Sequence, residues 1–74
     1  MAELKLKEER VDPGLFADIL RRTADAIEHG GPMQITLEGQ TRVLHPHGKL
    51  EVKYEVEKDE EELEFEVSWR KEPV

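Results

Sequence analysis

The run Leu63–Trp69, close to the end of the chain, constrains the fold more than any other stretch. It alternates large apolar residues with polar ones, in the order Leu-Glu-Phe-Glu-Val-Ser-Trp. Successive side chains of a β-strand point to opposite faces, so this run predicts a strand with one apolar face and one mainly acidic face. Such a strand needs a sheet partner and a layer that covers its apolar side. The rest of the chain must supply both.

The run Lys49–Glu57 supplies the sheet partner, because it alternates in the same way. Its apolar face holds Leu50, Val52, Tyr54 and Val56. The charged segment Lys58–Glu61 is expected to be the loop that joins the two strands as a hairpin. A loop of this length places Glu57 opposite Glu62. The predicted pairs across the apolar face are Val56–Leu63, Tyr54–Phe65, Val52–Val67 and Leu50–Trp69.

Residues 11–29 predict the covering layer, which is an amphipathic helix. Asp12 is a suitable N-cap, and Pro13 suits the first helical position, where no amide donor is needed. The run Gly30–Pro32 ends the helix at His29, because glycine adopts the left-handed C′ conformation and proline prevents continuation. At 100° per residue the apolar side chains fall within an arc of about 140°. They are Leu15, Phe16, Ile19, Leu20, Thr23, Ala26 and Ile27.

Three further stretches are predicted to be strands. Glu3–Glu9 alternates leucine with lysine and is expected at a sheet edge, since lysine deters edge pairing. Met33–Glu38 also alternates, and Thr41–His45 would return antiparallel to it through a tight turn at Gly39–Gln40. The register of the returning strand is open, because two adjacent apolar residues within it cannot both face inward.

Together these elements predict a single α+β domain over residues 1–74, in the order β-α-β-β-β-β. One amphipathic helix packed on one face of a mainly antiparallel sheet covers every apolar face with two layers. A chain of 74 residues leaves room for one domain of this kind. Residues 71–74 are expected to form a frayed tail.

The charge balance excludes several classes of partner. The chain has 18 acidic and 11 basic side chains, a net charge of −7, which disfavours direct binding to nucleic acid or to anionic membranes. Solubility explains the acidity most simply, and a basic protein partner is the alternative. No cysteine is present, so disulfides and thiolate chemistry are excluded. The N-terminus lacks a signal-peptide core and no run could span a bilayer, which predicts a cytoplasmic protein.

The polar faces of the last two strands form a candidate interaction surface, because glutamate dominates them. Its members are Glu51, Glu55, Glu57, Glu62, Glu64 and Glu66, with Trp69 at the end of the closing strand. An unpaired sheet edge is the other candidate surface, and it would also permit a weak homodimer beside a monomer. Trp69 shares the phase of the core residues, yet its place at the strand end leaves open whether it is buried or half covered at the sheet margin.

His45 and His47 are the only closely spaced pair of potential metal ligands. Imidazole together with carboxylates can bind zinc or nickel, but the intervening Pro46 indicates a turn and no spacing fixes a third ligand. A solvated loop is therefore the preferred interpretation, and no metal or cofactor is expected. His29 falls in the last helical turn, where a cation complements the helix dipole. A small-ligand or metal site near Trp69 or at the histidine loop is the alternative function.

Nothing in the sequence predicts an enzyme. Acid–base catalysis by paired carboxylates needs one carboxyl in an apolar pocket, whereas these glutamates alternate outward on strands. No glycine-rich phosphate loop precedes a helix, and Ser68 has no histidine placed to activate it. The preferred prediction is a non-catalytic protein-interaction module that uses a sheet edge or the acidic sheet face.

Three stretches, taken in order, resemble the amphi-Trp domain family of small bacterial and archaeal proteins. They are Leu15–Gly31, Leu50–Val56 and Leu63–Trp69. Members of that family have an amphipathic helix that ends in glycine, followed by strands and a closing acidic–apolar alternation into tryptophan. The resemblance extends over nearly the whole chain. It implies the architecture predicted above and supplies no catalytic residue.

Overall fold

A computed structural model describes residues 10–71 of the chain, which form one helix followed by four strands. The elements are α1 (Pro13–His29), β1 (Met33–Leu37), β2 (Gln40–Leu44), β3 (Lys49–Val56) and β4 (Glu61–Ser68). The α+β class is confirmed. The strand predicted at Glu3–Glu9 and residues 72–74 of the tail predicted at 71–74 lie outside the described residues, and Lys71 is exposed and follows the end of β4.

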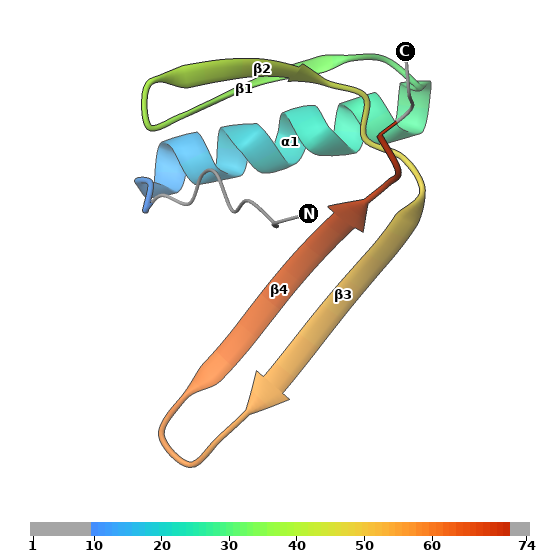
Figure 1. Ribbon diagram of the computed structural model, residues 1–74. Coiled ribbons are helices and arrows are strands. Elements are labelled where there is room, and N and C mark those ends of the chain that lie inside the picture. Colours follow the sequence, from blue (N-terminus) through green and yellow to red (C-terminus); the bar gives the residue numbers. More distant parts are fainter. Residues whose placement is uncertain (1–9, 72–74) are drawn as a thin grey trace, which may run out of the picture.

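The prediction of one continuous sheet is wrong, because the four strands form two separate antiparallel hairpins, β1–β2 and β3–β4 (Figure 1). The interruption falls at residues 45–48. Pro46 lacks the amide donor that a ladder requires. Gly48 has a φ of +89°, and a Cβ at this position would lie 2.6 Å from the backbone oxygen of Ser68. The chain thus turns and crosses the end of β4 where a continuous sheet would need it to stay extended.

Both ends of α1 are capped as predicted. The Asp12 carboxylate accepts a hydrogen bond from the Leu15 amide at 2.8 Å, and Pro13 occupies the first helical position. Gly30 adopts the left-handed conformation with a φ of 69°, and its amide donates to the carbonyl oxygen of Ala26. These local signals act within one turn of each helix end, so they needed no knowledge of tertiary structure.

The helix packs on the β1–β2 hairpin. Ala26 of α1 and Met33 of β1 are buried, and Pro46 is the one other buried residue in the described part of the chain. The Thr23 hydroxyl lies 3.3 Å from the Met33 sulfur. Arg22 donates to the Gln34 backbone oxygen and also pairs with Asp18 at 3.0 Å, so it joins the helix surface to the edge of β1.

The turn between β1 and β2 lies one residue earlier than predicted. Leu37 pairs with Gln40, so the two turn residues are Glu38 and Gly39 rather than Gly39 and Gln40. Their φ angles are 50° and 77°, as a type I′ turn requires at both central positions. The resulting register settles the question of the returning strand. Leu44 lies opposite Met33 and is half-buried, and its neighbour Val43 faces solvent.

The register of β3–β4 differs by two residues from the predicted one. Tyr54 lies opposite Leu63 and Val52 opposite Phe65. The backbones of Glu57 and Glu60 exchange two hydrogen bonds, of 2.8 and 3.3 Å, which leaves only two residues in the turn. A shift of two positions keeps every side chain on its predicted face, because the side-chain period of a strand is two. The composition of each face was therefore correct, and the partners across it were wrong.

The β3–β4 hairpin extends away from the layer formed by α1 and β1–β2 (Figure 1). The radius of gyration is 14.1 Å, compared with about 11 Å for a compact domain of this length. The prediction that α1 covers the apolar face of the last two strands is wrong for the described residues, since α1 packs against β1 and not against β3 or β4. The short hairpin packs against part of the apolar side of the helix through β1, and Leu15, Phe16 and Leu20 on that side remain exposed.

Candidate interaction surface and ligand groove

One face of the β3–β4 hairpin is apolar and exposed. Six large side chains on it are between 54% and 69% exposed. This hairpin apolar face consists of Leu50, Val52, Tyr54, Val56, Leu63 and Phe65. An exposed apolar patch of several hundred Å² on a small domain typically marks an interaction site. The alternation predicted these residues to be core, and the structure leaves them uncovered within residues 10–71.

The hairpin apolar face continues into an open groove beside α1. The groove has a volume of about 750 Å³ and is lined by Phe16 and Leu20 of the helix and by Leu63 and Phe65 of β4. Glu64 and Glu66 complete its lining. Phe16 is 54% exposed, so the helix adds a further apolar side chain beside the hairpin.

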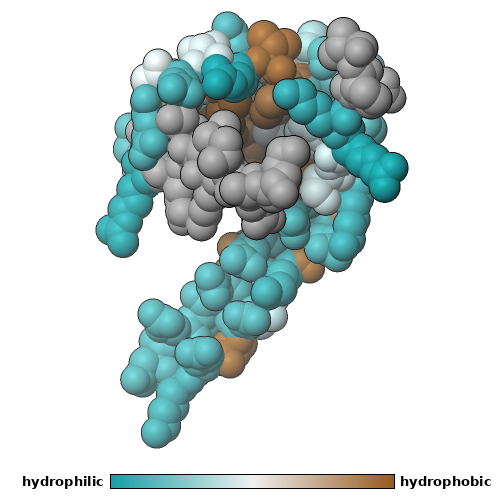
Figure 2. All heavy atoms as spheres, in the orientation of Figure 1, coloured by the Kyte–Doolittle hydropathy of each residue, from teal (hydrophilic) through white to brown (hydrophobic). Residues whose placement is uncertain are grey.

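The opposite face of the hairpin carries the predicted glutamates. In Figure 2, hydrophilic side chains cover most of the visible hairpin, and hydrophobic atoms emerge along its margin. Across the strands Glu51 pairs with Glu66 and Glu55 pairs with Glu62. All six predicted glutamates are exposed. The hairpin acidic face consists of Glu51, Glu55, Glu57, Glu62, Glu64 and Glu66.

Lys53 is embedded in the hairpin acidic face. Its ammonium group lies 3.6 Å from Glu55 and 3.5 Å from Glu64. These carboxylates, first Glu55 and then Glu64, raise the pKa of Lys53 above its usual range. One cation thus offsets part of the repulsion between like charges that face each other across this sheet.

Tyr54 forms the only polar contact that the described residues make across the hairpin apolar face. Its hydroxyl donates to the Glu61 carboxylate at 2.8 Å. Glu61 pairs with Val56 and therefore lies on the apolar face at the tip of the hairpin, although it was predicted to be a loop residue. The hydrogen bond to Glu61 is the larger of two causes that raise the pKa of Tyr54, and partial desolvation is the smaller one.

Trp69 lies apart from the hairpin acidic face, with which the sequence had grouped it. It follows the end of β4, is half-buried, and packs against the His47 ring with 5.6 Å between ring centroids and a tilt of 32°. The absence of a side chain at Gly48 allows this approach, since an added Cβ would lie 3.2 Å from the Trp69 Cβ. Trp69 therefore occupies the sheet margin, which was one of the two predicted alternatives.

A second groove lies where the two hairpins meet. It has a volume of about 680 Å³. This junction groove is lined by Arg42, Val43, Leu44, His45, His47, Trp69, Arg70 and Lys71. The structure thus brings both loop histidines and the tryptophan together with three cations. No sequence pattern indicated that Arg42 would lie here, because it is 28 residues from Arg70 and only the topology brings the two segments to one groove.

The two loop histidines form no metal site with a third ligand among the described residues. The Nδ1 of His47 donates to the His45 carbonyl oxygen at 2.6 Å, which ties this ring to its own loop. Within residues 10–71, the one group of three potential ligands is Asp25, Glu28 and His29, whose ligand atoms lie within 4.8 Å of one another.

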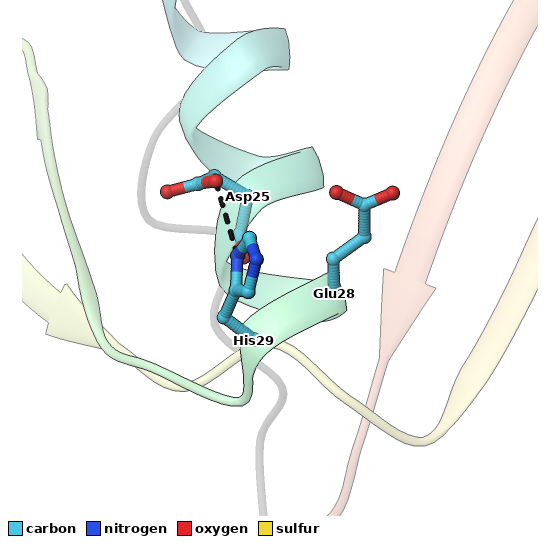
Figure 3. Close-up of side chains that lie close together, drawn as sticks. All are labelled: Asp25, Glu28 and His29. Carbon is cyan, nitrogen blue, oxygen red and sulfur yellow. Dashed lines mark hydrogen bonds and ion pairs between the residues drawn. The ribbon is translucent and has the colours of Figure 1, made fainter.

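The group on α1 arises from the spacing Asp-x-x-Glu-His, which the sequence interpretation overlooked. The His29 Nδ1 lies 3.1 Å from the Asp25 carbonyl oxygen and 3.2 Å from its carboxylate (Figure 3). All three side chains are exposed. His29 therefore has the helix-end position predicted for it. An exposed ion pair at this spacing is common at a helix end and needs no metal to explain it.

Comparison with known proteins places nearly the whole chain in one family. Residues 1–73 match the Amphi-Trp domain. No curated protein and no solved structure matches the chain. Within residues 10–71, α1 lacks the length and the apolar composition of a membrane-spanning helix.

Proposed function

Given that the chain belongs to the Amphi-Trp domain family, we propose that it is a non-catalytic protein-interaction module that binds through the β3–β4 hairpin. The observation that supports this most directly is the hairpin apolar face, six large side chains that are each more than half exposed. A two-stranded hairpin is at best marginally stable in water unless another element covers it. A partner that covers this face would supply the missing layer.

The chemistry of the partner follows from the two faces of the hairpin. Protein interfaces combine an apolar centre with a polar rim, and here the rim is acidic. The fitting partner is therefore a protein with an apolar patch or strand bordered by lysine and arginine. A second copy would bring another chain of charge −7 to the same place, so a basic partner fits better than a homodimer. The unpaired strand edges would nevertheless permit weak self-association.

The non-catalytic part of the proposal is supported by the exposure of the charged groups. Among residues 10–71 no polar or charged side chain is buried. Acid–base catalysis by carboxyl groups relies on at least one desolvated carboxyl beside a substrate cleft. The cytoplasmic location likewise stays a prediction from the sequence.

Affinity capture with matched baits tests the proposal. The full chain, the double variant Val52→Ser/Phe65→Ser and the triple variant Glu55→Lys/Glu64→Lys/Glu66→Lys serve as baits, with captured proteins identified by mass spectrometry. The expected partner has basic surface residues. The amount of it captured should fall at least about tenfold on the apolar variant, and should also fall with added salt and with charge reversal. Val43→Ser is the control, since Val43 is an equally exposed apolar residue (63%) on the other hairpin.

Two results would contradict the proposal. Capture of the same proteins by wild type and by the apolar variant would remove the hairpin apolar face as the binding surface. Capture of the same proteins by the charge-reversed variant would show that the acidic rim does not contribute to binding. Sedimentation at high micromolar concentration tests the homodimer. A monomer at that concentration would eliminate self-association through a strand edge.

A second candidate function is small-ligand or metal binding at the junction groove. The observation that favours it is the meeting of His45, His47 and Trp69 in one groove. Titration with zinc or nickel, followed by the NMR shifts of the histidine rings, tests the metal version. Unperturbed shifts at both rings would eliminate it.

A further inference from the structure

The junction groove is the most cationic place described on an acidic chain. Three of its eight lining residues are Arg42, Arg70 and Lys71, and none is aspartate or glutamate. The whole sequence has 18 acidic and 11 basic side chains, so a groove whose charged lining residues are all basic has the opposite charge to the chain as a whole. A groove lined by one sign of charge concentrates the opposite charge.

These cations have no acidic partner within residues 10–71. The ion pairs there join Asp18 to Arg22, Asp25 to His29, and the lysines of β3 to neighbouring glutamates. Among the described residues, the Arg42 guanidinium donates to neutral oxygens only, the Thr41 carbonyl at 3.2 Å and the Gln40 side chain at 3.3 Å. Because no described acidic side chain pairs with these cations, their charge is available to an anion. A guanidinium group can bind a carboxylate or phosphate with two parallel hydrogen bonds.

The same groove has apolar and aromatic walls. Trp69 is half-buried and held by His47, and Val43 is 63% exposed. A volume of about 680 Å³ lies in the range of small-molecule sites, which combine apolar walls with a few convergent polar groups. An indole fixed by a neighbouring ring offers a flat surface to a second ring.

We infer that the junction groove binds a small organic anion, with its phosphate or carboxylate group at Arg42 and Arg70 and its ring-bearing body against Trp69. This inference rests on the second candidate function above and names the ligand class. A polyanion is a poorer fit, because nucleic acid would meet the net charge of −7 beyond the groove. The three cations also make the groove a poor place for a divalent metal.

Trp69 provides the measurement, since it is the only tryptophan of the chain. The full chain is titrated at constant ionic strength with four probes. The probes are phenyl phosphate, benzoate, inorganic phosphate and benzyl alcohol. Saturable changes in Trp69 fluorescence are expected with phenyl phosphate, benzoate or both, and the stronger of the two identifies the preferred anionic group.

Variants locate the anionic group. Arg42→Ala and Arg70→Ala are each expected to lower the affinity for the probe by about fivefold, which corresponds to the loss of one charge-assisted hydrogen bond near the surface. Arg21→Ala is the matched control, because Arg21 is an exposed arginine on α1 that lies outside the groove lining. Two-dimensional NMR should place the shifted amides at residues 42–47 and 69–71.

Several outcomes would overturn the inference. Benzyl alcohol that binds as tightly as phenyl phosphate would retain a ligand site but refute its anionic class. Inorganic phosphate that binds as tightly would refute the ring-bearing body. No saturable change with any probe, or equal effects of Arg21→Ala and Arg42→Ala, would refute the site itself. None of these results affects the hairpin apolar face, because the apolar variant that tests that face changes Val52 and Phe65, which lie outside the groove lining.

Discussion

The two hairpins share an antiparallel pairing and a tight turn, but they differ in what surrounds them. The strands of β1–β2 have five residues each, and the hairpin is packed under α1 through Met33. The strands of β3–β4 have eight residues each, and all of β3 is exposed. The longer hairpin has the stronger alternation and the larger apolar face, yet among the described elements it is the one that no other element covers.

The comparison teaches that pattern strength and burial are separate properties. Alternation records which side of a strand is suited to burial, and it does not specify what does the burying. In β1–β2 the covering element belongs to the described part of the chain. In β3–β4 the same pattern persists over an exposed surface, as expected where the covering layer comes from a partner.

Met33→Ala is expected to have the largest effect on stability. Met33 is 7% exposed and contacts the helix, so its truncation leaves a cavity between α1 and β1 and lowers the free energy of unfolding by about 2–4 kcal/mol. Urea denaturation followed by circular dichroism measures this change. Phe65→Ala on the hairpin apolar face should lower it by less than about 1 kcal/mol, because half of that ring is already in water.

Equal losses for Met33→Ala and Phe65→Ala would break the comparison between the hairpins. That result would mean that Phe65 is covered in solution, and the β3–β4 face would then be part of the core. Val43→Ala is the control for an exposed strand position and should change the free energy of unfolding by no more than about 0.5 kcal/mol.

Gly48→Ala is expected to have the next largest effect, because Gly48 sets the crossing between the hairpins. An added Cβ would lie 2.6 Å from the Ser68 backbone oxygen, and the φ of +89° is strained for alanine. Together these should destabilise the chain by about 1–3 kcal/mol and move the Trp69 fluorescence toward that of a solvated indole. Thermal unfolding monitored at Trp69 measures both.

Gly31→Ala is the matched control for Gly48→Ala. Gly31 has no atom within 4 Å of an added Cβ and its φ lies outside the left-handed range, so substitution should be close to neutral. A neutral Gly48→Ala with unchanged fluorescence would show that the close crossing does not position Trp69.

A smaller effect is expected at the turn of β1–β2. Glu38 is the one described non-glycine residue with a positive φ, 50°, in a type I′ turn. Asparagine is strongly preferred at this position before glycine, so Glu38→Asn should raise the free energy of unfolding by about 0.5 kcal/mol. Glu38→Ala is the control, since it removes the same carboxylate without the turn preference. Equal stability of the two variants would contradict the argument.

The sequence predicted the parts of the fold that depend on neighbours along the chain. The caps of α1 at Asp12 and Gly30, the four strands after it and the faces of β1, β3 and β4 all follow from local periodicity and capping. It failed where geometry was decided by a single turn. Placing the last loop at residues 58–61 rather than around Lys58 and Asp59 shifted every pair of β3–β4 by two residues.

The candidate sites were less predictable for the same reason. Trp69 and His47 are adjacent because Gly48 lets two backbones approach, and Arg42 joins them through the pairing of β2. None of these contacts has a spacing signature. The exposure of the hairpin apolar face also could not be predicted, since a strand that faces a helix and a strand that faces a partner have the same alternation.

The smallest expected effect concerns Tyr54, and it sharpens the comparison at the tip of the uncovered hairpin. Its hydroxyl donates to Glu61 at 2.8 Å, which raises the pKa of Tyr54 above its usual value of 10.0. The folded state thus binds the phenolic proton more tightly than the unfolded state. Stability from this pair is fully present below the unfolded pKa and is lost as the pH rises through the folded one.

Ultraviolet titration of the phenolate, with Tyr54 as the only tyrosine of the chain, measures this pKa directly. Glu61→Ala should return the pKa toward 10.0, whereas Glu62→Ala, which removes a carboxylate from the opposite face, should leave most of the elevation in place. Equal effects of the two variants would mean that net charge, rather than the hydrogen bond, holds the proton. A Tyr54 pKa that is already ordinary in the wild type would mean that the hairpin tip is open in solution, and the uncovered hairpin would then need the proposed partner even to keep its two strands paired.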